Sequence, residues 1–592
     1  MFKKNQFTRL IRTISCNFYG MKLLLTIVSL FTVFISLAQG DDSKKNNVQK
    51  SDYVKTYWDS KGAQPKTEGH LFSDGFTGIG KEHGLWKFWY RNGKLEEVAN
   101  YYKGNLNGGV TKYYENGNKK HVGYFKMGIQ DSINQNYHEN GELMEKGFYK
   151  MGEKTGKWQY YNNKGKLIEE EEHVDGVILI MYHVDEFSGE ATVNNGNGKL
   201  IYYYDKDRIR QVIEYKNGKM DGSFVENNPG GVKIIEGTFV QNVKEGVWKY
   251  NYHSGKPKEI MTYKNNLLEG EYKMLFENDT LNITGSYDDG KKTGKWAWYF
   301  ENGKPDMSGS FVDDLQDGDW IYYHQNDKVS YTAQYKNGMK HGKWEYFYKG
   351  GELWTTGTYA DDEKDGEWIT RYESGKTLTQ GNYVKGKEEG LWKNWYETGT
   401  VKDEGEFKAG KQTGVWNGYY PNGKPNYAGS FRDGYKSGKW RYYFNNGKLK
   451  DEGDYKVVEK TEKFENENSK HKVAQKYQES EKSGKWVSYD ERGTKVSEGS
   501  YSNGEMDGNW KYYYPGGVVA AEEMNYKNGK LDGKSTSYTR TGKVSTSTEY
   551  KDGLRHGHSI VYDKKGKMLQ DKEYENGKIK VDDKVKFVPG GH

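Results

Sequence analysis

The chain has very little cysteine, proline and aliphatic sequence for its 592 residues. It contains one cysteine, Cys16, and eight prolines, and only 34% of its residues are hydrophobic. A single thiol excludes an intramolecular disulfide framework and a cysteine metal site. The low hydrophobic fraction excludes the aliphatic core of an ordinary enzyme, and a mean hydropathy of −1.06 is typical of disorder. Order therefore has to come from the 75 glycines and 52 tyrosines.

A one-sided surplus of positive charge is also missing from most of the chain. The formal net charge is +6, but the first 38 residues hold five basic residues and no acidic residue. Removing these five from the 90 basic residues leaves 85 against 84 acidic residues. Nucleic-acid binding needs a basic stripe that neutralises phosphates, whereas alternating lysine and glutamate is typical of a solvated strand face. We therefore expect no nucleic-acid partner.

The one marked hydrophobic run lies near the N-terminus. From Met21 the sequence has a cation at Lys22, an apolar run over 23–37 and a small residue, Ala38, at the expected cleavage point. We expect residues 1–38 to be a secretory signal peptide, with Met21 as the true start, and 39–52 to be a polar linker. A membrane span needs about 20 apolar residues, so an uncleaved anchor is the second interpretation.

This signal predicts where the mature chain is found. We expect it in the periplasm, at the cell surface or secreted, with no integral membrane span. Cys16 precedes the apolar run, so the sequence lacks the lipid-modified cysteine that follows such a run in bacterial lipoproteins.

The chain is rich in a Gly-x-Trp pattern that returns every 24 residues. The landmark glycines are Gly222, Gly246, Gly270, Gly294, Gly318, Gly342, Gly366, Gly390, Gly414 and Gly438. At eight of these ten positions a landmark tryptophan follows two residues later, at Trp248, Trp296, Trp320, Trp344, Trp368, Trp392, Trp416 and Trp440. Self-similarity at a fixed period indicates a repeat array, in which each unit contacts only its neighbours.

Residues 438–455 show how one unit is expected to fold. The aromatic residues at 440, 442 and 444 recur with a period of two, which predicts a strand that carries these rings on one face. Asn446-Gly447 then predicts a type I′ hairpin turn, in which both central residues have positive φ. The returning strand has a Gly-x-aromatic pattern, and its glycine is expected to leave room for a ring from the adjacent strand.

Together these units predict an all-β fold. Tandem 24-residue β-hairpin repeats form a long, twisted, mostly single-layer antiparallel meander, stabilised by cross-strand aromatic pairs of ~0.2–1 kcal/mol each. We assign the continuous array to 53–580, with irregular segments near 170–205 and 456–482, and a C-terminal tail to 581–592. Such inserts tend to protrude from one face and to carry binding, although a neutral drifted unit is the other interpretation.

The unit resembles the bacterial variant of the MORN repeat, in which Tyr-Tyr-x-x-Asn-Gly-Lys precedes Gly-x-Tyr-x-x-Gly-Lys-x-x-Gly. One copy fits this pattern at Tyr419, Tyr420, Asn422, Gly423, Lys424, Gly429, Phe431, Gly434 and Gly438. The resemblance implies a MORN-like fold and a protein-binding scaffold. It also implies an antitoxin-like label for some members of the family and lipid binding for others.

No catalytic or cofactor-binding set stands out from the repeats. Gly75–Lys81 has most of a phosphate-binding loop, but Glu82 stands where Ser or Thr must hold magnesium. His556 and His558 share a strand face but have no evident third ligand. We therefore expect no enzymatic activity, no cofactor and no metal site. The same loop-like spacing recurs in the repeat's own turns, at 285–291, 381–387 and 405–411.

The row of landmark tryptophans is the remaining candidate binding surface. Equally spaced rings on one face form either the packed layer of the sheet or a platform for sugars, and packing is favoured because a single-layer sheet has no other apolar material to bury. The candidate residues are Trp296, Trp320, Trp344, Trp368, Trp392, Trp416 and Trp440.

The sequence as a whole predicts an exported, non-enzymatic repeat scaffold that mediates protein–protein interaction at the bacterial cell envelope. The first alternative is binding of cell-wall or other polysaccharide through exposed aromatic residues, and the second is an antitoxin-like or immunity role. A protein partner is expected, and a polysaccharide ligand stays open.

Overall fold

The computed structural model describes residues 51–73, 80–465 and 472–580, and every regular element in these ranges is a β-strand. The predicted signal peptide 1–38, nearly all of the linker 39–52, most of Gly75–Lys81 and the tail 581–592 lie outside the described residues. Within the described ranges no helix is long and apolar enough to cross a membrane. The chain divides into two units, Met1–Val184 and Asp185–His592, at a boundary inside the predicted irregular segment 170–205.

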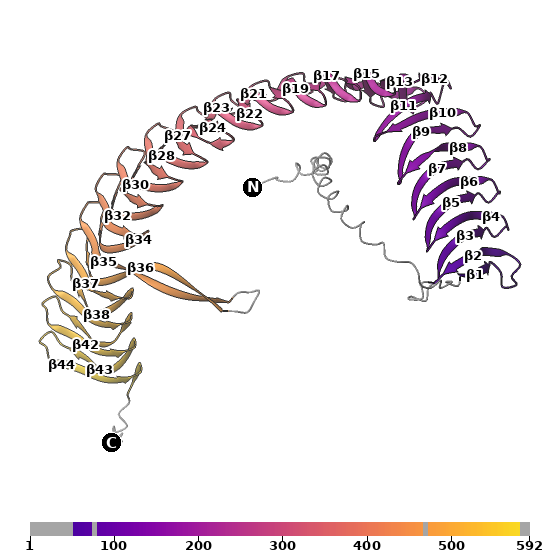
Figure 1. Cartoon of the computed structure of the whole chain (residues 1–592). Coiled ribbons are helices and arrows are strands. Elements are labelled where there is room, and N and C mark those ends of the chain that lie inside the picture. Colours follow the sequence, from indigo (N-terminus) through magenta and orange to yellow (C-terminus); the bar gives the residue numbers. More distant parts are fainter. Residues whose placement is uncertain (1–50, 74–79, 466–471, 581–592) are drawn as a thin grey trace, which may run out of the picture. The chain divides into compact units, whose positions relative to one another are not determined.

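The first unit is an antiparallel meander in which each strand pairs with the next along the chain (Figure 1). Its strands are β1 (Ser51–Tyr57), β2 (Pro65–Phe72), β3 (Lys81–Trp89), β4 (Leu95–Tyr102), β5 (Asn105–Tyr113), β6 (Lys119–Lys126), β7 (Ile129–Tyr137), β8 (Leu143–Lys150), β9 (Glu153–Tyr161), β10 (Leu167–Val174) and β11 (Val177–Val184).

The second unit repeats the same sequential antiparallel pairing. Its first strands are β12 (Ala191–Asn194), β13 (Asn197–Asp205), β14 (Arg208–Lys216), β15 (Lys219–Asn227), β16 (Lys233–Val240), β17 (Val243–Asn251), β18 (Pro257–Lys264), β19 (Leu267–Leu275), β20 (Leu281–Asp288), β21 (Lys291–Tyr299), β22 (Pro305–Val312) and β23 (Leu315–Tyr323). Next come β24 (Val329–Lys336), β25 (Met339–Lys340), β26 (Gly342–Phe347), β27 (Leu353–Ala360), β28 (Glu363–Arg371), β29 (Thr377–Val384), β30 (Lys387–Trp395), β31 (Val401–Lys408), β32 (Lys411–Tyr419), β33 (Pro425–Arg432) and β34 (Tyr435–Tyr443). The last are β35 (Leu449–Glu465), β36 (Lys472–Tyr489), β37 (Lys495–Ser502), β38 (Glu505–Tyr513), β39 (Ala520–Lys527), β40 (Lys530–Leu531), β41 (Gly533–Tyr538), β42 (Val544–Lys551), β43 (Leu554–Tyr562), β44 (Met568–Glu575) and β45 (Lys578–Ile579).

This arrangement confirms the predicted all-β meander of tandem hairpins. The sheet has one face that carries the landmark tryptophans, here called the tryptophan face, and an opposite face set by the alternation of side chains along each strand.

The turn after each tryptophan strand differs from the prediction. In the Asn446-Gly447 turn only Gly447 has positive φ, and its N–H donates to the Phe444 carbonyl at 2.8 Å. This is a type I turn followed by a left-handed glycine, so the predicted type I′ turn is wrong at this end of the unit. The asparagine has another use, because the Asn446 side-chain amide donates to the Glu491 carbonyl in the next such turn at 2.8 Å.

Type I′ turns occur instead at the other end of the unit. Asp289 and Gly290 both have positive φ, and they join Asp288 to its strand partner Lys291. A two-residue loop with this geometry matches the right-handed twist of the flanking strands. The two ends of each hairpin unit therefore use different turn chemistry.

The predicted irregular segment 456–482 is one elongated hairpin, formed by β35 and β36, that leaves the sheet as a two-stranded arm (Figure 1). Near its base Lys456 pairs with Glu481, as Arg432 pairs with Tyr435 beside the type I′ turn of the preceding unit. The arm is thus the regular hairpin extended by added residues rather than a separate domain.

Candidate functional site

The landmark tryptophans lie against glycines of the preceding strand, except that Trp344 has Ala333 at this position. A Cβ added to Gly309 would stand 2.0 Å from the Trp320 ring, and one added to Gly285 would stand 2.1 Å from the Trp296 ring. The ring therefore occupies the space of the missing side chain, as the Gly-x-aromatic pattern predicted. The same contact joins Gly357, Gly381, Gly405, Gly429 and Gly453 to Trp368, Trp392, Trp416, Trp440 and Trp486.

Each indole also has a polar partner at this contact. The indole N–H of Trp320 donates to the Ser310 carbonyl at 3.2 Å, and that of Trp440 donates to the Ser430 carbonyl at 3.1 Å. The strand register shifts beside the covered glycine, between Ser308 and Ser310 in the first case. A phenylalanine would fill much of the same volume but would lose this hydrogen bond, which explains why tryptophan recurs.

Two further contacts enclose most of these rings. Phe311 meets Trp320 edge to face, with centroids 5.2 Å apart and an interplanar angle of 89°. Lys364 Nζ lies over the Trp368 ring at 4.1 Å, and burial there lowers the pKa of Lys364. Edge-to-face pairs and cation–π contacts each stabilise such a layer by about 0.5–1.5 kcal/mol.

The seven candidate tryptophans are consequently part of the packed layer of the sheet. Six of them are at most 5% exposed, and only Trp392 is half-buried. A ring that has a glycine under one face and aromatic or lysine side chains around it presents no platform to a sugar.

The opposite face of the first unit carries exposed apolar side chains. Phe148 on β8 is 54% exposed and lies across from Ile133 on β7, which is 38% exposed. Tyr124, one repeat before Phe148, is 44% exposed. Sequence reasoning missed this patch because it searched the tryptophan face. The available signal was the recurrence of aromatic residues directly after the glycines Gly123 and Gly147.

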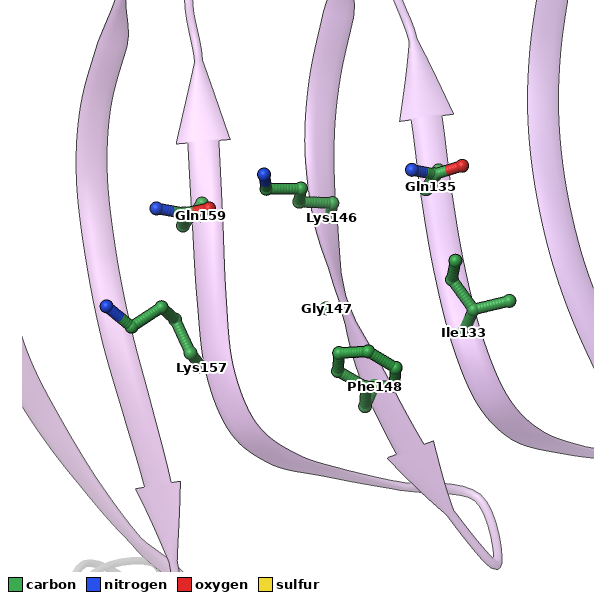
Figure 2. A pocket seen from close by; sticks show the side chains of 7 residues that line it. All are labelled: Ile133, Gln135, Lys146, Gly147, Phe148, Lys157 and Gln159. Carbon is green, nitrogen blue, oxygen red and sulfur yellow. The ribbon is translucent and has the colours of Figure 1, made fainter.

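Phe148 and Ile133 line a shallow hollow of about 310 Å³, here called the Phe148 hollow (Figure 2). Polar side chains from β7, β8 and β9 complete its lining. Lys157 forms an ion pair with Glu170 at 2.7 Å, and the amide of Gln159 donates to the same carboxylate at 2.7 Å. The full lining is Ile133, Gln135, Lys146, Gly147, Phe148, Lys157 and Gln159.

The second unit contains a matched hollow at the equivalent strand positions. This Ser310 hollow has a similar volume of about 300 Å³, and its lining also includes the apolar residues Trp296, Ala297 and Ile321. Lys295 stands at the position of Ile133, and Ser310 at that of Phe148. Its lining is Thr284, Lys295, Trp296, Ala297, Ser308, Gly309, Ser310, Asp319 and Ile321.

The remaining motifs singled out in the sequence are explained by the strands, turns and side-chain contacts in which they lie. The loop-like stretch 285–291 is part of β20 and its type I′ turn, and no helix follows it. His558 Nδ1 lies 3.0 Å from Asp571, which raises the pKa of His558, whereas His556 Nδ1 accepts from the Asn576 N–H. Across the part of the chain that the structure describes, no three His, Cys, Asp or Glu side chains are grouped to hold a metal ion.

A family model for the MORN repeat variant matches eleven segments of the chain. The chain carries tandem copies of the MORN repeat variant. The matched segments are 82–103, 130–151, 244–265, 292–313, 316–337, 340–361, 364–385, 388–409, 412–433, 436–456 and 506–528.

Similarity to individual proteins is remote. No curated protein sequence matches the chain. Solved structures that resemble parts of it include TcdB2-TccC3, at 9% identity over 89% of this chain and 32% of that chain, with a TM-score of 0.11. TcdB2-TccC3 without its hypervariable C-terminal region matches at 9% identity over 84% of this chain and 31% of that chain, also with a TM-score of 0.11.

The Photorhabdus luminescens Tc holotoxin pore, in a form with a TccC3 mutation, matches at 10% identity over 85% of this chain and 31% of that chain, with a TM-score of 0.11. This chain spans about a third of the length of these solved chains. At such TM-scores the likeness gives no information on the function of the MORN-repeat chain.

Proposed function

We propose that this MORN-repeat chain is an exported, non-enzymatic scaffold that binds a protein partner at the bacterial cell envelope through the Phe148 hollow. The observation that carries the proposal is the exposed apolar pair Phe148 and Ile133, in a hollow whose counterpart in the second unit has Ser310 and Lys295 at these two positions. Protein interfaces combine an apolar centre with a polar rim, and aromatic side chains supply much of their binding energy.

The composition of the rim supports this proposal. The apolar pair is surrounded by Lys146, Lys157 and the amides of Gln135 and Gln159, which offer both donors and acceptors to a partner (Figure 2). Strands that bond to their neighbours along their length hold these side chains in fixed register. A rigid sheet that presents an ordered patch loses little conformational entropy on binding.

Capture of a partner by matched variants tests the proposal. The affinity-tagged chain would be cross-linked in its own cells as wild type, as the double variant Ile133→Lys with Phe148→Lys, and as the control Ser310→Lys. We expect one protein to co-purify at near-equal stoichiometry with wild type and control, and at least tenfold less with the double variant. Circular dichroism of the purified variants checks that each is folded.

Two results would contradict the proposal. Equal capture by all three chains would place the partner site elsewhere on the array. Retention of wall polysaccharide without a protein would favour the polysaccharide alternative.

The proposed export has its own test. Cleavage before Gln39 is predicted by the cation Lys22, the apolar run 23–37 and the small residue Ala38. Mass spectrometry is expected to show that the mature chain begins at Gln39. An N-terminal peptide that still contains the apolar run would support the uncleaved anchor instead.

A further inference from the structure

Trp392 is exceptional among the landmark tryptophans. It covers Gly381 and donates its indole N–H to the Asn382 carbonyl at 3.2 Å, as the other landmark tryptophans do with their own glycine strands. Yet it is half-buried, whereas Trp368 and Trp416 in the neighbouring repeats are at most 5% exposed. Its backbone position is regular, so the cause lies in the surrounding side chains.

Trp392 lacks a lysine that covers other tryptophans of the array. Trp320 and Trp416 lack it too, with Gln316 and Gln412 four positions before the tryptophan, and both rings are buried. In several repeats the residue four positions before the landmark tryptophan is a lysine that lies over the indole. The distances from Nζ to the ring centroid are 4.2 Å for Lys244, 5.0 Å for Lys292, 5.0 Å for Lys340, 4.1 Å for Lys364, 4.5 Å for Lys436 and 4.3 Å for Lys482. At Trp392 this position holds Glu388.

The Glu388 side chain leaves the indole uncovered. Its carboxylate turns toward the next turn of the array, where Oε2 lies 3.4 Å from the place of a Cβ on Gly410. The neighbouring Lys364 lies over Trp368 and also over Tyr383, at 4.7 Å. Among the described residues no lysine or arginine lies over the Trp392 ring.

The positions beside Trp392 also lack aromatic side chains, as do those beside the buried Trp368, which are Thr355 and Thr370. Around Trp320 the positions beside the tryptophan carry Met307 and Tyr322, and Tyr322 stacks on the indole at 5.9 Å. Around Trp392 the equivalent positions carry Thr379 and Asn394. Asn394 in turn donates its amide to Asp403, its partner on the next strand, so a carboxylate stands beside Asn394, two residues from the Gly405 that pairs with Trp392.

We infer that Trp392, flanked by Asp403 and Glu388, binds the cationic side chain of a lysine or arginine from the protein partner. The partner's cation would occupy the position that a lysine of the chain itself takes in other repeats. An indole attracts a cation through its negative face, and nearby carboxylates add Coulombic attraction. The inference rests on the proposed protein-binding function and adds a second contact on the tryptophan face.

The chemistry of the site favours a cation over a sugar. The ring of Trp392 is already covered by Gly381 on one side, and it meets Tyr383 and Phe407 edge to face at 5.1 Å and 5.8 Å. At the position four residues before the tryptophan, this repeat has the acid Glu388, whereas the neighbouring repeats have Lys364 and Gln412. A neutral saccharide makes no use of that difference in charge.

Fluorine NMR of the whole chain, labelled with 5-fluorotryptophan, tests the inference. The Trp392 signal is assigned with Trp392→Phe, and a decalysine peptide is the probe. We expect a saturable shift of the Trp392 signal, with the signals of the buried landmark tryptophans unmoved. Glu388→Lys restores the lysine of the repeat and is expected to weaken decalysine binding at least tenfold, while Asp319→Asn, a distant exposed acid, leaves it unchanged.

A neutral Gly-Ser decapeptide and an N-acetylglucosamine hexamer serve as further probes. A shift of the Trp392 signal by the hexamer, no shift by decalysine, or undiminished binding to Glu388→Lys would each overturn the inference. Unmoved signals from the other tryptophans in Glu388→Lys show that this variant is folded.

The two proposals fail separately. If the captured partner binds Trp392→Phe as tightly as wild type, this inference fails and the Phe148 hollow stands. If wild type captures no protein, the proposed function fails whatever decalysine does.

Discussion

Two stretches of the second unit share one backbone pattern but differ in how they enclose their tryptophans. Around Trp320 and Trp344 the flanking positions hold Met307, Tyr322, Tyr331 and Tyr346, and Tyr322 stacks on Tyr331 with centroids 4.0 Å apart. Around Trp392 the same positions hold Thr379 and Asn394. The period therefore fixes the glycine–tryptophan contact. The flanking residues add to the enclosure of a ring but do not decide it alone, because Trp368 is buried between Thr355 and Thr370.

Removal of the indole should have the largest effect and should separate the two stretches. Trp320→Ala empties a fully enclosed site and is expected to cost about 4 kcal/mol, whereas Trp392→Ala removes a half-buried ring and is expected to cost about 2 kcal/mol. Native-state hydrogen exchange of β23 and β30 measures each local free energy of opening. Equal losses would show that the flanking residues contribute little to enclosure.

Filling the space under the ring should have a somewhat smaller effect. Gly309→Val forces the Trp320 ring away and is expected to cost about 3 kcal/mol, because the neighbouring aromatic residues leave the ring nowhere to move. Gly381→Val should cost less, since Trp392 has an open side. Gly109→Ala is the control, because a Cβ there has no atom within 4 Å and the expected change is below about 0.5 kcal/mol. Hydrogen exchange of the three strands measures each effect, and a large loss for Gly109→Ala would contradict this account.

Exchange of one flanking residue should uncover the tryptophan of the first stretch and cover that of the second. Tyr331→Thr removes the stack with Tyr322 and is expected to destabilise the first stretch by about 2 kcal/mol. Thr379→Tyr should cover Trp392, which the fluorine NMR signal of that residue would report as a loss of its response to decalysine. An unchanged response would show that the flank does not control access to the ring.

Alkaline titration should distinguish the stretches without mutation. Burial raises the pKa of Tyr331, Tyr335 and Tyr346, around Trp344, above the ordinary value of 10.0, and it also raises the pKa of Tyr383, which meets Trp392 edge to face. A raised folded-state pKa adds stability that is fully present below pH 10 and is lost as the pH rises toward the folded-state value. The Trp344 fluorine signal, from a ring that stacks on Tyr331, is therefore expected to broaden at lower pH than that of Trp392. The reverse order would contradict the prediction.

Replacement of the arm should have the smallest effect on stability. An Asp-Gly turn in place of residues 457–480 joins Lys456 to Glu481 and recreates the regular hairpin. Because the arm lies beyond the sheet, we expect the free energy of unfolding to change by less than about 0.5 kcal/mol. Urea denaturation followed by circular dichroism measures the change, and a loss of solubility or of strand signal would show that the arm supports the array.

Much of the fold follows from local sequence. The meander and the packing of rings on glycines were predicted from three local features. These are the 24-residue phase, the alternation of residues 440 to 444 and the glycine before each aromatic residue. The type I′ prediction for Asn446-Gly447 failed because Asn-Gly also occurs where a type I turn is followed by a left-handed glycine. Only the φ angle of the asparagine distinguishes the two turn types. The hydroxyl of Tyr420, which donates to the Tyr443 carbonyl at 2.7 Å, was missed because its partner lies one repeat away.

The sequence by itself determined the repeat, the all-β fold class and the identity of the residues that pack, because these depend on spacing within about 24 positions of the chain. Only the tertiary structure decided which rings are covered and which face carries an open apolar pair. Exposure depends on side chains that meet across strands, as Phe148 meets Ile133. Such differences leave the period intact, and they become visible only when neighbouring strands are placed in register.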